Sequence, residues 1–308
     1  MDRSFLNLSL LISLLLWFSC GSTADITRES DYQETDLTLQ EEIQMTKEVL
    51  PEMSKEYPPH PDRTLQRYVT SVGEKIVMAN NLDNNPYEYS FTVVSSEQIN
   101  AFALPAGNIF ITSGLIKMAE SEAELAGVIG HEIAHVTNRH TAKRMYAQKK
   151  GKNKDIIYGT IGAVGGGLAG IGVGKLICKK GDKKCVQNAS IGGLVAGGAG
   201  GLLVRKYTFM KNYQRDEMQA DREGFNYAIT AQYSKEHVGL FYKKLLEMES
   251  QYKKGDKLSS AFVDAFSTHP PSRERVTQMN RLISATEQSN NSIVTTNNWD
   301  EIKNRVSR

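Results

Sequence analysis

The sequence predicts an α+β fold that is predominantly helical, with a small β-sheet or hairpin beside a central helix. Apolar residues recur at helical spacing after Asp62 and again after Ser121, and further helices are expected at 213–228 and 235–252. Two short stretches, 89–94 and 108–112, are rich in β-branched and aromatic residues and indicate strands. The 308 residues, 40% of them hydrophobic, can bury a core without staples.

The charge balance argues against one broad class of partner. The 37 basic and 35 acidic residues leave a formal net charge of +2. No basic stripe interleaved with aromatic residues accompanies it, so nucleic acid is not an expected partner.

The first twenty residues indicate an export signal. Arg3 precedes an apolar run that ends at Phe18, and small residues surround Cys20. This arrangement resembles a bacterial lipoprotein signal peptide, residues 1–20, in which Cys20 would carry lipid and become the N-terminus. Trp17 stands where such signals usually have Leu. A plain cleaved signal and an uncleaved anchor are the alternatives, although the run is short for a membrane span.

A lipidated Cys20 would place the protein in the bacterial cell envelope, facing the periplasm. Ser22 is not the aspartate that retains lipoproteins in the inner membrane of some bacteria, which favours the outer membrane. We expect residues 21–60 to form a tether and then a helix near 34–50. The main domain would cover 61–284, and the polar residues 285–308 would form a poorly ordered tail.

An apolar, Gly-rich hairpin is expected within the main domain, at 156–204. Its two arms flank a charged turn between Cys178 and Cys185, which are predicted either to form a disulfide or to remain free thiols. We interpret this insert as a hairpin that contacts the membrane or covers a substrate, rather than as a true span. A flexible loop is the other interpretation.

The segment His131-Glu132-Ile133-Ala134-His135 lies within the helix that Ser121 and Glu124 are predicted to open with a capping box. Residues four apart share one face of a helix, so His131 and His135 can bind the same metal ion. Glu132, next to that face, can reach an attacking water without binding the metal, as a general base must. The pentapeptide alone occurs by chance in many proteins.

A catalytic zinc usually has three protein ligands, so a third is needed. The long metzincin pattern fails, because it requires Gly and His where this sequence has Asn138 and Thr141. His140 lies about 140° around the helix from His135, and we interpret it as a structural or surface histidine.

Glu217 is the better candidate for the third ligand. It lies four residues before Asp221, so a helix would place both carboxylates on one face. Glu217 could bind zinc while Asp221 accepts the N–H of a ligand histidine. Alone, these residues would be taken for a solvated acidic face; following the histidine helix, they predict a gluzincin site with one Zn²⁺ per chain.

Four segments of the sequence are informative in combination: Asn100–Gly107, Gly130–Val136, Glu217–Asp221, and Thr268-His269-Pro270 with Arg275. Together they resemble the HtpX- and BepA-type metallopeptidases, which are related to the CAAX prenyl protease and to LoiP-type periplasmic lipoprotein proteases. The resemblance covers roughly residues 60–282, and Ala106 departs from the Gly that is usual there.

The resemblance implies roles for particular residues. His131, His135 and Glu217 would bind zinc, and Glu132 would be the base. His269 would lie near the metal, either contacting the intermediate or capping the zinc in a closed state, and Arg275 would stabilise the oxyanion. An edge strand would bind the substrate backbone by strand addition. That strand would consist of Asn100, Ala101, Phe102, Ala103 and Leu104.

The predicted function is that of a zinc-dependent metalloendopeptidase. The resemblance suggests misfolded envelope proteins as its polypeptide substrates. The membrane is an expected partner through the lipid, and the hairpin is a second candidate for contact with it. A non-hydrolytic periplasmic chaperone or assembly lipoprotein using the same cleft is the main alternative. A structural lipoprotein organised around the hairpin is another.

Overall fold

A three-stranded mixed sheet lies at the centre of the fold. The structure is a computed structural model, and it describes residues 37–150, 212–253, 263–288 and 290–307. The strand order is β1-β3-β2. Strand β1 (Ser90–Val94) runs parallel to β3 (Asn108–Thr112), whereas β2 (Ala101–Leu104) runs antiparallel to β3. The strands expected at 89–94 and 108–112 are confirmed, and β2 lies at an edge of this sheet.

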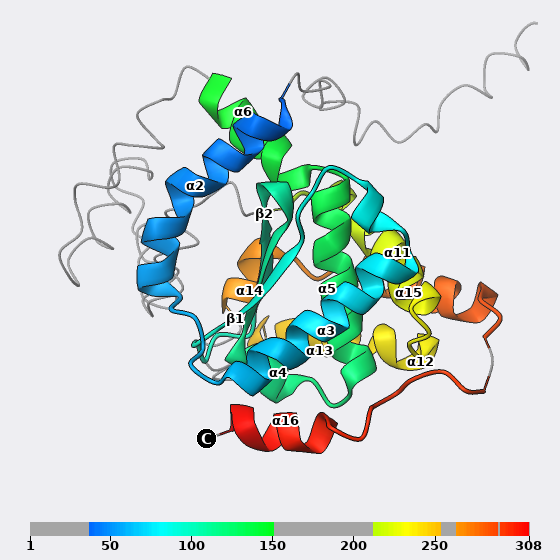
Figure 1. Cartoon of the computed structure of the whole chain (residues 1–308). Helices are drawn as coiled ribbons and strands as arrows, with labels where there is room; N and C mark the ends of the chain where they lie inside the picture. The colour runs from blue at the N-terminus through cyan, green and yellow to red at the C-terminus, as the bar shows by residue number, and fades with distance from the viewer. Residues whose placement is uncertain (1–36, 151–211, 254–262, 289, 308) are drawn as a thin grey trace, which may run out of the picture. The chain divides into compact units, whose positions relative to one another are not determined.

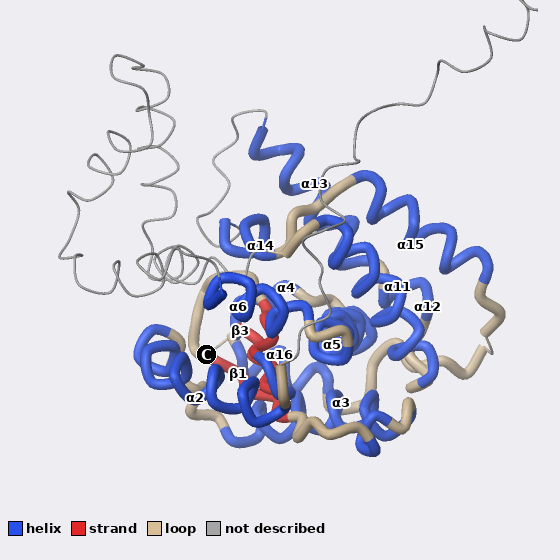
Figure 2. Tube along the Cα trace, turned by 90° about the horizontal axis from the view of Figure 1, so that it is seen from above, coloured by secondary structure: helices blue, strands red, loops and turns tan. Residues whose placement is uncertain are grey.

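The sheet lies between helix α2 (Leu39–Glu56) on one side and helices α3 (Arg63–Ala79) and α5 (Glu122–Thr137) on the other (Figures 1 and 2). Consecutive strand residues point to opposite faces, so the apolar side chains divide into two groups. The group in the main core with α3 and α5 is Phe91, Val93, Ala101, Ala103, Ile109 and Ile111. The group that packs with residues of α2 is Val94, Phe102 and Leu104.

Helix α2 begins later than the predicted range of 34–50 and extends to Glu56. Its start is set by a capping box, in which Thr38 accepts from the backbone N–H of Glu41 and the Glu41 carboxylate accepts from that of Thr38. Pro51 lies inside the helix, and the side chain of Met53 beyond it is buried against the sheet. Packing on the sheet therefore extends the helix past the proline.

A tight turn joins β2 to β3 through the short helix η3 (Pro105–Gly107). Ala106 has φ 62° and ψ 22°, in the left-handed region that glycine adopts without strain. The sequence departs from the usual glycine at this position, but the turn keeps the conformation that glycine favours, so Ala106 is strained. Gly107, at φ 97°, approaches the carbonyl of Glu88, where a Cβ would lie 2.7 Å from the oxygen.

The remaining helices pack around the sheet and α5. Helix α11 (Gln214–Thr230) confirms the helix expected at 213–228, but that expected at 235–252 is divided into α12 (Lys235–Val238) and α13 (Leu240–Lys253). The break is at Gly239, where a Cβ would lie 2.6 Å from the side chain of Met279. The other short or peripheral helices are η2 (Leu82–Asn84), α4 (Ser113–Met118), α6 (His140–Lys150), α14 (Val263–Thr268) and α15 (Arg273–Ala285).

The prediction of a poorly ordered polar tail at 285–308 is wrong for most of that segment. Helix α16 (Trp299–Val306) packs against α3 and α4 (Figure 1). Lys303 donates to three backbone carbonyls at the C-terminal end of α4. One face of α16 is buried, and the residues that form it are Trp299, Ile302 and Val306.

Truncation of Trp299 tests this C-terminal packing. Trp299 is 3% exposed, and removal of a buried Trp side chain typically costs about 3–5 kcal/mol. We expect Trp299→Ala to lower the free energy of unfolding in urea by about this amount. Asp300→Ala, at an exposed position of the same helix, should cost less than about 1 kcal/mol. Equal small effects would show that α16 contributes nothing to stability.

Several predictions lie outside the described residues. These are the signal peptide at 1–20 with Cys20, the hairpin at 156–204, and the pairing of Cys178 with Cys185. Among the helices of the described part, none has the length and apolar character needed to cross a membrane.

Candidate metal and active site

Helix α5 carries the His-Glu-x-x-His segment in its buried second half. Ser121 caps the helix by accepting from the backbone N–H of Glu124, so the helix begins where the sequence predicts. His131 and His135 lie on one face, one turn apart, and their Nε2 atoms are 3.0 Å apart. Both side chains are buried, so their metal-binding nitrogens meet in a shielded interior site.

Helix α11 brings a carboxylate to these histidines because it approaches α5 very closely. A Cβ on Gly130 would lie 2.6 Å from the carbonyl oxygen of Gly224, so neither helix has room for a side chain there. The Glu217 side chain, fully buried, lies with Oε1 3.1 Å from Nε2 of His135 and Oε2 3.4 Å from Nε2 of His131. The close contact between Gly130 of α5 and Gly224 of α11 therefore lets Glu217 reach the two histidines of α5.

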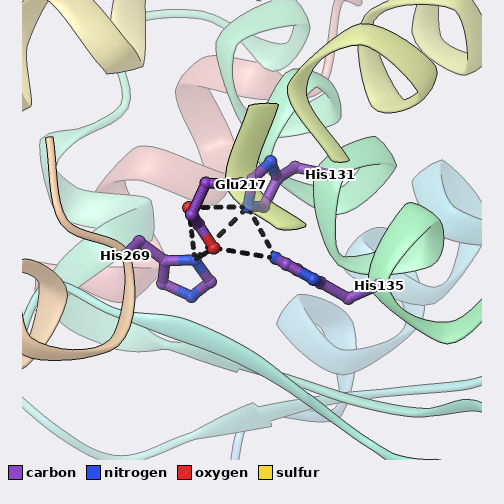
Figure 3. A group of neighbouring side chains, drawn as sticks. All are labelled: His131, His135, Glu217 and His269. Atoms are coloured by element: carbon purple, nitrogen blue, oxygen red, sulfur yellow. Dashed lines mark hydrogen bonds and ion pairs between the residues drawn. The ribbon is translucent and has the colours of Figure 1, made fainter. Parts of the chain in front are cut away.

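His269 joins the same group from the end of α14. Its Nδ1 lies 3.2 Å from both carboxylate oxygens of Glu217. Figure 3 shows the four side chains converging from α5, α11 and the segment after α14. One potential ligand atom from each lies within 4.8 Å of the others, and the group that could hold a metal ion is His131, His135, Glu217 and His269.

Asp221 and Arg275 form a buried layer behind the ligands. Asp221 Oδ1 lies 2.9 Å from Nδ1 of His131. Arg275 donates hydrogen bonds to both oxygens of Asp221, at 2.6 and 2.7 Å, and its Nη1 lies 2.6 Å from Glu217 Oε2. Asp221 thus lies behind His131, and the Arg275 guanidinium contacts the two carboxylates.

The buried charges of the site favour a cation. Three buried carboxylates lie here, those of Glu132, Glu217 and Asp221, and the one guanidinium, that of Arg275, pairs with the last two. Burial opposes protonation of His131, but Glu217 and Asp221 outweigh it and raise the pKa of His131 to about 10. A divalent cation bound here would neutralise the negative charge of the carboxylates and would take the place of the proton on His131.

Glu132 differs from the other two carboxylates. Its Oε1 lies 3.4 Å from Nε2 of His269, while its Oε2 is buried and has no hydrogen-bond partner in the described structure. Burial raises the pKa of Glu132, which makes its carboxylate a stronger proton acceptor. An unpartnered buried oxygen beside the ligand group fits a residue that awaits a water molecule or substrate.

His140 has a more specific place than its interpretation as a structural or surface histidine implied. The helix breaks at Asn138 and Arg139, and α6 then begins at His140. Nδ1 of His140 lies 2.8 Å from Nδ1 of His135. If His135 binds a metal through Nε2, its Nδ1 carries the proton and donates to His140. In that case His140 would orient a ligand without binding the ion itself.

Asn212 is a site residue that the sequence reasoning missed. Its Nδ2 lies 3.3 Å from Nε2 of His135 and 3.3 Å from Nδ1 of His269. Its backbone N–H donates to the carbonyl of Thr268, which ties the start of α11 to the end of α14. No motif marks this residue, and a lone Asn two residues before a helix carries no signal by itself.

Strand β2 presents its outer edge to the same site. The backbone carbonyl of Asn100 pairs with Thr112, so alternation directs the carbonyls of Ala101 and Ala103 away from β3. His269 Nε2 lies 3.1 Å from the Ala101 oxygen, and Thr141 donates to the Ala103 oxygen. Both outward carbonyls of the edge strand therefore have partners within the chain.

Replacing His140 tests whether it orients His135. Loss of a group that holds a ligand histidine typically lowers metal affinity 10–100-fold. We expect His140→Ala to weaken Zn²⁺ binding by this factor in competition with a chromogenic chelator. His237→Ala, which removes a histidine outside the site, should leave the affinity unchanged. Equal affinities for the two variants would contradict the orienting role.

The fold and this site define a metallopeptidase. One helix carries an HExxH segment whose glutamate is buried beside the two histidines, and a second helix supplies a further carboxylate. The sequence profile of peptidase family M48 matches residues 63–283, and the chain belongs to that family.

Similar proteins include the beta-barrel assembly-enhancing protease of Escherichia coli K12, 27% identical over 80% of this chain and 46% of its own length. The putative protease of the same name in Vibrio cholerae is 30% identical over 70% of this chain and 38% of its own length. The mitochondrial metalloendopeptidase OMA1 of Schizosaccharomyces pombe is 31% identical over 36% of this chain and 33% of its own length. The chain thus spans less than half the length of each.

Proposed function

We propose that this chain is a zinc-dependent endopeptidase in which His131, His135 and Glu217 hold the metal and Glu132 is the general base. The single observation that carries the proposal is the buried, unpartnered Oε2 of Glu132 beside a converging group of His and Glu side chains. A structural metal site needs no such neighbour, whereas a hydrolytic site needs a base placed beside the ion.

Zinc fits this group better than a hard cation. Imidazole suits zinc, whereas calcium and magnesium prefer oxygen ligands. Zinc ligands at about 2.0–2.2 Å in a tetrahedral arrangement are roughly 3.3–3.5 Å apart. The Nε2 atoms of His131 and His135 are 3.0 Å apart. Glu217 Oε1 lies 3.1 Å from that of His135 and Glu217 Oε2 lies 3.4 Å from that of His131, so a small expansion of the site suffices.

Bound zinc would polarise the scissile carbonyl and lower the pKa of water. Glu132 then accepts the proton of the attacking water and passes it to the leaving amine. Asp221 holds His131 through Nδ1, and Arg275 holds Asp221 and Glu217 in place. Arg275 thus acts as a positioning residue, in place of the oxyanion role that the resemblance implied.

Substrate would enter as an added strand along Asn100, Ala101, Phe102, Ala103 and Leu104. The backbone groups of Ala101 and Ala103 lie on the outer edge of β2, as this mode of binding requires. His269 contacts the Ala101 carbonyl and Glu217 together, so a bound substrate backbone would replace the first contact. His269 could then contact the intermediate, whereas in the closed arrangement it caps the metal.

The N-terminal sequence and the relatives support a proposal for the cellular role. Two of the relatives carry a name that refers to β-barrel assembly, and one is mitochondrial. We propose that this chain is a lipoprotein anchored through Cys20, facing the periplasm and most consistent with the outer membrane. Its substrates would be misfolded envelope polypeptides, and a chaperone that does not cleave them is the less favoured alternative.

A cleavage assay tests the proposal. Purified full-length protein loaded with Zn²⁺ should cleave unfolded casein, lose this activity in a chelator, and regain it when Zn²⁺ is restored. A protein that binds casein and suppresses its aggregation, yet releases no peptides in either condition, would instead be a chaperone.

A further inference from the structure

The side chain of Asn212 lies among the candidate metal ligands. It is 6% exposed, and its Nδ2 lies 3.3 Å from Nε2 of His135 and 3.3 Å from Nδ1 of His269. Its Oδ1 is buried and has no hydrogen-bond partner among the described residues. Buried polar atoms normally have partners, so the amide of Asn212 calls for an explanation.

Neither histidine is a lasting partner for the N–H groups of this amide. His135 Nε2 is the atom that would bind zinc, and a coordinated nitrogen has no lone pair left to accept a hydrogen bond. His269 Nδ1 lies 3.2 Å from both oxygens of Glu217, so it is placed to donate to that carboxylate rather than to accept from Asn212. The metal-loaded site would therefore leave the amide buried and unsatisfied until a guest supplies hydrogen bonds.

A small cavity beside Asn212 provides the place for such a guest. Its volume is about 10 Å³, close to what one water molecule needs, so it suits a single oxygen atom rather than a side chain. Its lining includes Asn212, Glu132, His135 and Ala103 of the edge strand β2. The amide thus shares this space with the proposed base, a candidate metal ligand and the strand along which substrate would lie.

The oxygen that gains charge during peptide hydrolysis is that of the scissile carbonyl. When water adds to the carbonyl carbon, an electron pair of the C=O bond moves to this oxygen, and the water gives up a proton to Glu132. An N–H group that donates to the carbonyl oxygen stabilises the transition state more than the ground state, and therefore raises the rate. Donation to the attacking water would instead weaken it as a nucleophile.

We propose that Asn212 is a further catalytic residue, whose Nδ2 donates a hydrogen bond to the carbonyl oxygen of the scissile bond. The inference rests on the proposed peptidase function. A peptide backbone offers both acceptors and donors, so a bound substrate can also supply an N–H to the unpartnered Oδ1. The backbone N–H of Asn212 donates to the Thr268 carbonyl, and substitutions of the side chain leave that bond in place.

The experiment uses full-length, zinc-loaded protein and one fluorogenic peptide, taken from casein around a bond that mass spectrometry shows to be cleaved. A phosphonamidate of the same sequence carries a tetrahedral anionic group in place of the scissile carbonyl. We expect Asn212→Ala to lower kcat about 10²–10³-fold, the range for loss of one such donor, with little change in KM. The dissociation constant of the phosphonamidate, measured by calorimetry, should rise at least 10-fold, and the affinity for Zn²⁺ should stay at the wild-type value.

Two further variants complete the set. Asn212→Asp keeps the size of the side chain and its acceptor oxygen but removes the donor, so it should be impaired at least as much as Asn212→Ala. Asn226→Ala is the matched control, because Asn226 is an exposed asparagine of helix α11, and it should equal the wild type in every measurement. Zn²⁺ content and thermal melting verify each variant.

Wild-type kcat and phosphonamidate binding in Asn212→Ala would overturn this inference alone, and so would full activity in Asn212→Asp. A loss of Zn²⁺ affinity that accounts for the lost activity would also overturn it, because Asn212 would then hold the metal site together. Should Asn212→Ala fail to fold, Asn212→Asp decides by the same measurements. If the zinc-loaded wild type cleaves no bond of casein, the proposed function fails, and this inference with it.

Discussion

Replacing Glu132 by Gln is expected to reduce peptide cleavage by roughly 10²–10⁴-fold, the contribution typical of a general base. The substitution keeps the shape of the side chain and removes its capacity to accept a proton. Glu132 is not among the residues whose atoms converge on the metal position, so the Zn²⁺ content should stay at the wild-type level. The measurement is kcat/KM on one unfolded substrate, together with metal analysis of the same sample.

Glu97→Gln is a suitable control for this change, because Glu97 is exposed and its carboxylate pairs with Lys117 on the surface. Its activity should equal that of the wild type. If Glu132→Gln cleaves as fast as the wild type with full zinc content, Glu132 is not the base. A loss of both zinc and activity would instead give Glu132 a role in holding the site together.

Replacing Arg275 by Met is expected to lower the free energy of unfolding by about 3–5 kcal/mol in the presence of a chelator. Arg275 is 2% exposed, and it contacts the carboxylates of Asp221 and Glu217. Removal of one partner from a buried ion pair leaves uncompensated charge in the interior, which accounts for a loss of this size. Urea unfolding of the metal-free protein measures it.

Arg281→Met provides the matched control, since Arg281 is an exposed arginine on the same helix, α15. That change should stay within about 0.5 kcal/mol of the wild type. Arg275→Lys should fall between the two, because lysine keeps the charge but cannot reproduce the two parallel bonds to Asp221. If Arg275→Met is as stable as Arg281→Met, the carboxylates do not depend on Arg275.

The parts of the fold that were predictable are those with a strong local signal. The cap at Ser121 and the spacing of His131 and His135 define a helix face, and Glu217 with Asp221 defines another. How closely these helices approach depends on Gly130 and Gly224, which contact each other across a long sequence separation. Local periodicity carries no information about such a contact.

Other features were missed for different physical reasons. His140 follows a helix break at Arg139, which has a φ of 59°. The expected position of His140 relative to His135 assumed one continuous helix, and the break removes that assumption. Arg275 was assigned by analogy, and only the structure reveals its contacts with Asp221 and Glu217. The terminal helix α16 did carry a signal, three apolar residues at helical spacing, which the polar composition around it obscured.

The central claim is that His131, His135 and Glu217 hold one catalytic metal ion, and metal stoichiometry tests it most directly. Elemental analysis of purified wild-type protein, set beside Glu217→Ala, gives the answer in one experiment. The account predicts about one zinc per chain in the wild type and a clear fall in the variant. A wild type without zinc, or a variant that retains the full amount, would contradict it.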